Sequence, residues 1–106
     1  MLNCYLTKRW GGTIQNPQPG DLASALNELS QNDQEHPDCS LNTEEGWSLS
    51  VFESGLVVFE NIEIGEGPKH MHAVPRNVAL ELWQLLQANE MSLLQQKPWG
   101  EGYGNT

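Results

Sequence analysis

Hydrophobic residues at helical spacing predict two amphipathic helices. After Asp21, which suits an N-cap or first-turn position, leucine and alanine recur every three or four residues, so we predict a helix over 21–31. A second run of valine, leucine and tryptophan follows Pro75, a residue favoured in a first helical turn, and predicts a helix over 75–88. A brief helical turn is expected at 91–94.

Alternating apolar and polar residues predict a β-hairpin in the middle of the chain. Residues 47–52 place Trp, Leu and Val on one face, and Gly55 supplies the tight turn that follows. The return strand is apolar on both faces at first and continues with weaker alternation to residue 64, which is typical of a strand inside a sheet. We expect two more short strands, at 4–10 and 69–74.

These elements together predict an α+β fold, with a small antiparallel sheet of about four strands and two helices packed on one face. The polar segment 31–46 is expected to be an adaptable loop, apart from a short strand at Leu41. A chain of this length buries one core, so residues 1–106 are expected to form a single domain.

The location predicted from the sequence is the cytoplasm. No stretch approaches the roughly 18 apolar residues of a membrane span. The first residues lack the basic start and apolar core of a signal peptide. We therefore expect a cytoplasmic protein that does not bind membranes.

Charge is unevenly distributed along the chain. There are 14 Asp and Glu against 5 Lys and Arg, a formal net charge of −9, and no basic residue lies between Arg9 and Lys69. Eleven acids lie in that segment: Asp21, Glu28, Asp33, Glu35, Asp38, Glu44, Glu45, Glu53, Glu60, Glu63 and Glu66. We expect them to lack local ion pairs and to speed encounter with a basic protein, the alternative being an ordinary solvated face. Direct binding to nucleic acid is not expected, because phosphate contacts need clustered Lys and Arg.

His70 and His72 have the spacing most suggestive of a metal site. On a strand, residues two apart face the same way, so both imidazoles could reach one ion. His36 and Cys39 could complete a four-ligand set if the polar segment folded back over them. The alternative is a pair of ordinary histidines at an exposed edge, and we expect no cofactor.

No catalytic signature is present in the sequence. The chain has no nucleophile elbow, phosphate-binding loop or dinucleotide fingerprint. Cys4 and Cys39 are interpreted as structural thiols, since small domains that depend on disulfides usually carry more cysteines. Adjacent carboxylates such as Glu44 and Glu45 are usually solvated. We therefore expect a protein that is not an enzyme.

Several segments occur in a familiar order. The stretch WGGTIQNP at 10–17 leads into the leucine-rich helix that begins near Asp21, and GWSLSV at 46–51 and GLVVF at 55–59 form the hairpin. An Asn-Pro dipeptide, a leucine-rich helix and an apolar hairpin thus follow one another over residues 10–64. This order resembles the small bacterial immunity proteins of polymorphic toxin systems, a family that includes inhibitors of deaminase toxins.

The resemblance implies a bacterial, cytoplasmic antitoxin that binds the toxin domain made by the same cell and blocks its active site or substrate groove. Toxins acting on nucleic acids carry basic grooves, which an acidic domain can occupy. We therefore predict a non-enzymatic immunity protein, and its candidate partner-binding residues are Glu35, Asp38, Glu44, Glu45, Glu60 and Glu63.

Two other functions stay open. One is a small metal-binding protein or metal-dependent enzyme centred on His70 and His72. The other is a structural domain that forms a homodimer or larger oligomer through an exposed edge of the hairpin.

Overall fold

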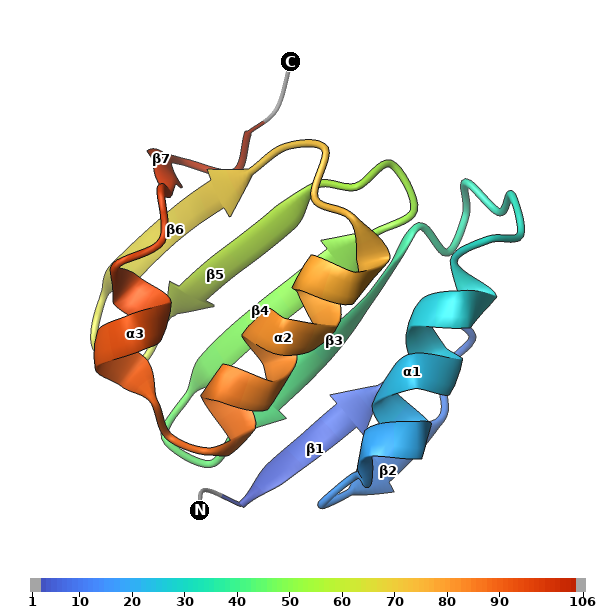
Figure 1. The fold of residues 1–106 in the computed structure, drawn as a ribbon, viewed down its shortest axis with the longest axis horizontal. Coiled ribbons are helices and arrows are strands. Elements are labelled where there is room, and N and C mark those ends of the chain that lie inside the picture. Colours follow the sequence, from blue (N-terminus) through green and yellow to red (C-terminus); the bar gives the residue numbers. More distant parts are fainter. Residues whose placement is uncertain (1–2, 105–106) are drawn as a thin grey trace.

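A computed structural model describes residues 3–104, and within them seven strands form one antiparallel sheet with three helices on one of its faces (Figure 1). The strands are β1 (Cys4–Thr7), β2 (Thr13–Gln15), β3 (Asp38–Thr43), β4 (Trp47–Phe52), β5 (Val57–Asn61), β6 (Glu66–Met71) and β7 (Gly100–Glu101). The helices are α1 (Pro19–Glu28), α2 (Arg76–Gln87) and α3 (Met91–Gln95). The strand order across the sheet is β2-β1-β3-β4-β5-β6-β7.

The predicted α+β class is confirmed, whereas the predicted number of strands and helices is wrong. Strands β2 and β7 have only three and two residues, too short to show a period in the sequence. Strand β3 lies in the segment that was expected to be mostly loop. Every second residue of β3 is polar and faces away from the helices, so the sequence shows no apolar run there. Strand β3 nevertheless pairs with both β1 and β4.

Both amphipathic helices form close to their predicted bounds. Helix α1 begins at Pro19, and the Asp21 carboxylate accepts the backbone N–H of Gln18 at 2.8 Å, so Asp21 caps the helix from inside its first turn. Helix α3 corresponds to the brief turn expected after α2. In the part of the chain that the structure describes, no helix has the length and apolar character needed to cross a membrane.

Tryptophans join the helices to the sheet. Trp83 of α2 is fully buried, and its indole N–H donates to the carbonyl oxygen of Leu49 at 2.9 Å. The rings of Trp47 and Trp99 both stack on Phe59, with centroid distances of 4.8 and 5.3 Å. Buried aromatic side chains contribute the largest apolar areas of a small core, so these contacts fix the helices on one face.

The predicted hairpin is formed by β4 and β5, and it lies inside the sheet. Since β4 pairs with β3 and β5 pairs with β6, neither strand has a free edge, so the exposed hairpin edge that was expected to pair with a second copy is not present. Strand β5 ends at Asn61 rather than near residue 64. Ile62 and Ile64 therefore lie in the turn before β6, where they are 80% and 63% exposed.

We call the sheet surface that faces away from the helices the open face. The register and the alternating burial of the strands place mostly polar side chains on it: Tyr5, Thr7, Thr13, Gln15, Asp38, Ser40, Asn42, Ser48, Ser50, Phe52, Val58, Glu60 and His70. Among residues 3–104 no helix covers this face (Figure 1). The segment after β7 contacts it at Glu60 and His70.

Candidate docking surface on the open face

The six acids predicted to bind a partner lie at two ends of the sheet. Glu35 and Asp38 lie at the end where β3 begins. The other four lie in the β3–β4 turn, at the end of β5 or in the turn that follows it: Glu44, Glu45, Glu60 and Glu63. Because β3, β4 and β5 are consecutive antiparallel strands, these two turns share one end of the sheet. The fold therefore gathers four of the six.

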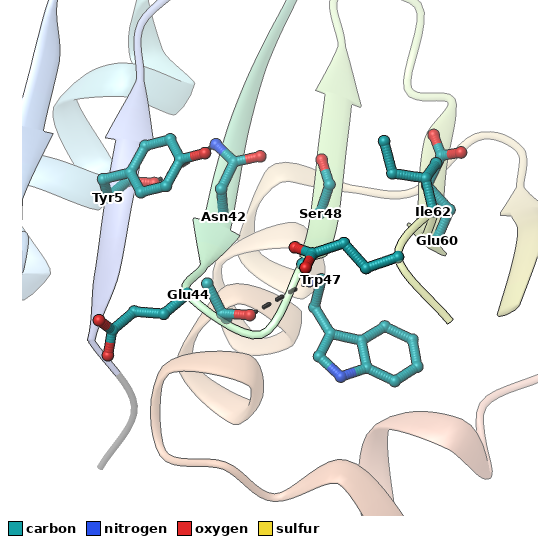
Figure 2. A pocket seen from close by; sticks show the side chains of 10 residues that line it. Tyr5, Asn42, Glu44, Trp47, Ser48, Glu60 and Ile62 are labelled. Atoms are coloured by element: carbon teal, nitrogen blue, oxygen red, sulfur yellow. Dashed lines mark hydrogen bonds between the residues drawn. The ribbon is translucent and has the colours of Figure 1, made fainter. Parts of the chain in front are cut away.

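A pocket of about 440 Å³ opens at this end of the open face, and we call it the acidic pocket (Figure 2). Three carboxylates line it, together with one aromatic ring, an isoleucine and two small polar side chains: Glu44, Glu60, Glu63, Tyr5, Ile62, Asn42 and Ser48. Trp47 also borders the pocket, but its ring stacks on Phe59 on the helix-facing side. Figure 2 shows Tyr5, Asn42 and Ser48 on three neighbouring strands, β1, β3 and β4. The pocket is thus assembled from segments far apart in the sequence.

The two turns that border the acidic pocket are tied together by Asn61, which is fully buried. Its Nδ2 donates to the carbonyl oxygen of Glu45 at 3.0 Å, and its Oδ1 accepts the backbone N–H of Glu63 at 3.0 Å. At Gly46, where φ is +94°, an added Cβ would lie 2.5 Å from Oε2 of Glu63. Glycine therefore allows both the left-handed backbone and the approach of this carboxylate.

Neighbouring side chains also hold the other two carboxylates. Asn3 Nδ2 donates to Oε1 of Glu44 at 2.7 Å. The Tyr103 hydroxyl donates to Oε1 of Glu60 at 2.8 Å, and this bond raises the pKa of Tyr103. Contacts that already orient the acidic groups reduce the entropy lost when a partner binds them.

The described part of the open face carries no cation. Lys69 on β6 lies directly opposite Phe59 of β5 and shares its helix-facing side. The other four basic residues lie after β1, at the start of α2 or after α3: Lys8, Arg9, Arg76 and Lys97. Across residues 3–104, accordingly, no ion pair involves the three carboxylates of the acidic pocket.

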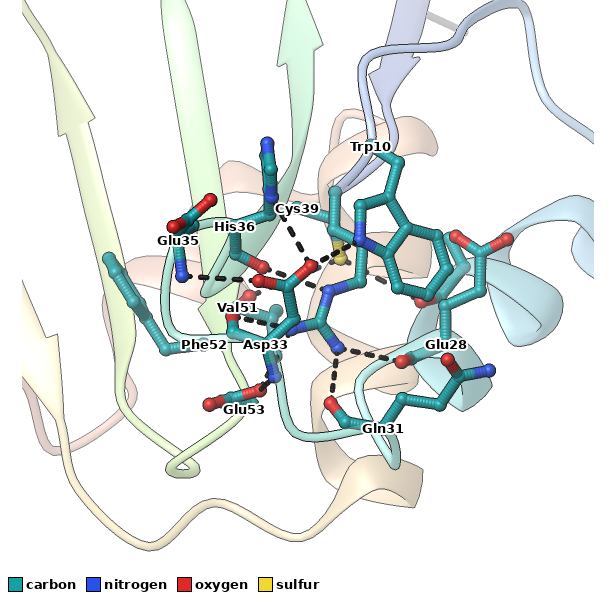
Figure 3. Close-up of polar contacts among 12 residues, drawn as sticks. Trp10, Glu28, Gln31, Asp33, Glu35, His36, Cys39, Val51, Phe52 and Glu53 are labelled. Atoms are coloured by element: carbon teal, nitrogen blue, oxygen red, sulfur yellow. Dashed lines mark hydrogen bonds and ion pairs between the residues drawn. The ribbon is translucent and has the colours of Figure 1, made fainter.

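At the opposite end of the sheet, one buried arginine organises the chain between α1 and β3. Figure 3 shows residues that surround it, among them Glu28, Gln31 and Asp33. The Arg9 guanidinium donates at 2.7–3.0 Å to four backbone carbonyls and one carboxylate, those of Glu28, Gln31, Asp33, His36 and Glu53. The start of the segment 31–46 is therefore fixed by a buried cation, contrary to the expectation of an adaptable loop.

Two of the eleven acids contradict the expectation that this segment has no local ion pairs. Lys8 Nζ lies 3.4 Å from Oε2 of Glu28, and Arg9 Nη2 lies 2.8 Å from Oε2 of Glu53. Both cations come just before the segment in sequence, and the β1–β2 hairpin brings them beside it. The sequence pattern did not show this pairing, because it depends on tertiary structure.

The acids at this end are engaged by the protein itself. The indole N–H of Trp10 donates to Oδ2 of Asp33 at 2.7 Å and, together with His36, lowers the pKa of Asp33. The backbone N–H of Asp33 and the Arg9 guanidinium lower the pKa of Glu53. Burial raises the pKa of Asp38 instead. Asp33 and Glu53 are therefore held in place by donors of the protein itself.

The four candidate metal ligands do not gather at one place. His70 and His72 are neighbours, with ring centroids 5.0 Å apart, and His70 Nδ1 lies 3.0 Å from the carbonyl oxygen of Gly102. His36 instead contacts Asp33, 3.2 Å away. Between residues 3 and 104, no three His, Cys, Asp or Glu side chains are grouped so that they could hold a metal ion. The four-ligand set is therefore not formed.

Both thiols are buried and not bonded to each other. Cys4 on β1 lies opposite Thr43 of β3. Thr43 is four residues from Cys39 along this strand, which is about 13 Å at the usual rise per residue. Burial raises the pKa of Cys4, and it raises the pKa of Cys39 to about 12. A buried thiol with a raised pKa is a poor nucleophile.

The sequence alone did not identify Tyr5, Asn42, Ser48 or Asn61 as parts of a site. The one available sign was Asn61, a polar residue that ends an apolar strand just before an Ile-Glu-Ile-Gly turn. Searches against known protein families, curated proteins and solved structures found no match to this chain.

Proposed function

We propose that this chain is a non-enzymatic protein-binding domain, an immunity protein that binds and inhibits a cognate toxin through the acidic end of its open face. One observation carries the proposal. The acidic pocket places three carboxylates on a sheet surface without helices, and no cation within the described residues accompanies them. Such a surface attracts a basic protein and gives it a concave place to dock.

Inhibition would follow from occupying the partner's own binding groove. A toxin that acts on nucleic acid needs Lys and Arg along that groove to contact phosphates. The carboxylates of Glu44, Glu60 and Glu63 offer the same sign of charge as phosphate, so the groove cannot hold substrate and inhibitor together. The sequence resemblance to immunity proteins supports the same function.

Co-expression with the toxin tests this proposal. In the native genome, we expect a neighbouring gene for a large secreted protein with a toxic C-terminal domain. Cells that produce this domain should stop growing, and co-expression of the present chain should restore growth. The double variant E44K/E63K should protect poorly, whereas E81K/E90K, an equal charge change at two exposed acids of the helical side, should protect fully. The proposal would be refuted if the toxic domain still stopped growth when the wild-type chain was co-expressed with it.

A further inference from the structure

This inference rests on the proposed function and concerns the chemistry of the partner. We propose that the acidic pocket receives an arginine side chain of the partner protein, and that Ile62 provides the apolar contact beside it.

Exposed apolar side chains collect around the acidic pocket. Six large hydrophobic side chains are exposed among the described residues: Tyr5, Trp10, Ile62, Ile64, Leu93 and Tyr103. Tyr5 and Ile62 line the pocket, Tyr103 donates a hydrogen bond to its Glu60, and Ile64 belongs to the same turn as Ile62. Apolar groups encircled by charge are typical of binding hot spots, because the apolar groups gain by burial and the charges guide encounter.

The acceptors of the pocket suit a guanidinium better than an ammonium. Carboxylates reach it from three segments, the β3–β4 turn, the end of β5 and the β5–β6 turn, so they approach a bound cation from different directions. Asn42 and Ser48, on the strands beneath the pocket, add an amide oxygen and a hydroxyl. A guanidinium has five N–H donors in a fixed plane, whereas an ammonium is a compact and more strongly hydrated point charge.

The aromatic lining favours the same ligand. Tyr5 is 38% exposed and lines the pocket beside Asn42 (Figure 2). A guanidinium plane stacks on aromatic rings while its edges donate hydrogen bonds. The buried Asn61 and the glycine at position 46 keep the two bordering turns in place before binding. Arginine therefore uses every kind of group that the pocket presents.

NMR titration of the full chain tests the inference without the toxin. The probes are N-acetyl-arginine amide, N-acetyl-lysine amide and the neutral isostere N-acetyl-citrulline amide. We expect saturable shifts of the backbone amides of Tyr5, Asn42 and Ser48 with the arginine compound, weaker binding of the lysine compound and no response to the citrulline compound. Affinity for the arginine compound should fall about tenfold in E60Q/E63Q, as expected for lost charged hydrogen bonds. It should be unchanged in E81Q/E90Q, a matched pair of exposed acids on the helical side.

Several results would overturn the inference: shifts spread evenly over all acidic segments, equal binding of the lysine and arginine compounds, or no loss in E60Q/E63Q. Its failure can be told apart from failure of the proposed function. A chain that protects cells from the toxin but does not bind the arginine compound refutes the arginine pocket alone. A chain that binds the arginine compound but gives no protection retains the pocket and refutes toxin inhibition.

Discussion

Replacing Arg9 by methionine tests whether this buried cation organises the chain between α1 and β3. The Arg9 side chain is completely buried and donates to four backbone carbonyls and one carboxylate. Methionine keeps much of the apolar stem but removes every donor, so the chain between α1 and β3 loses its central anchor. We expect the variant to be much less stable, with local opening of residues 31–37.

The magnitude follows from what the substitution leaves behind. Removing one partner of a buried ion pair costs about 3–5 kcal/mol, because the other groups stay desolvated. Summing every lost hydrogen bond of Arg9 would overestimate the effect, since much of the segment 31–37 is exposed and water can reach the freed carbonyls. A domain of this size is stable by about 5–15 kcal/mol. The variant should therefore fold, with a large part of its stability lost.

Urea unfolding followed by tryptophan fluorescence measures the loss, and amide hydrogen exchange locates it. The matched control is Lys8→Met, which removes the neighbouring cation. The Lys8 pair with Glu28 spans 3.4 Å, and the two side chains are 35% and 25% exposed, so the control should lose no more than about 1 kcal/mol. Equal, small losses in both variants, with unchanged exchange in residues 31–37, would show that Arg9 does not organise this segment.

Three further predictions concern stability and reactivity. Trp83→Phe removes the buried indole N–H that donates to Leu49 and should cost about 1–3 kcal/mol in urea unfolding. The pKa values of Asp33 and Glu53 are lowered in the folded state, so their stabilisation is present above their ordinary values of 3.8 and 4.5 and is lost as pH falls through the folded values. Unfolding between pH 7 and 3 should show this loss, reduced in Glu53→Gln. The Cys39 thiol, with a pKa of about 12, should resist a thiol reagent at pH 8 until urea unfolds the chain.

Local periodicity explains which elements could be predicted from the sequence. Helices α1 and α2 and the β4–β5 hairpin each carry an apolar face with a regular period, so their residues reveal them without knowledge of their neighbours. Strand β3 is different, because polar residues on the open face alternate with the buried Cys39 and Leu41, so its apolar positions do not stand out in the sequence. Strands β2 and β7 are defined by pairing with β1 and β6 rather than by any pattern of their own.

The candidate site was only partly predictable, because its assembly depends on strand order. The charge pattern pointed to Glu44, Glu45, Glu60 and Glu63, which the fold brings to one end of the sheet. The pairing of β1 with β3 adds Tyr5, which lies near the start of the sequence, and no local sequence feature predicts this contact. The role of Arg9 was hidden for the same reason, since all five of its acceptors come from later segments.

The proposed function requires the acidic end of the open face to dock a basic protein. The most direct test is the association rate of the chain with the toxin domain proposed as its partner, measured at several salt concentrations. We expect a rate that falls as salt rises, a slower rate and weaker salt dependence for E44K/E63K, and a nearly wild-type rate for E81K/E90K. A wild-type rate and salt dependence for E44K/E63K would contradict the proposal and place the docking surface elsewhere on the molecule.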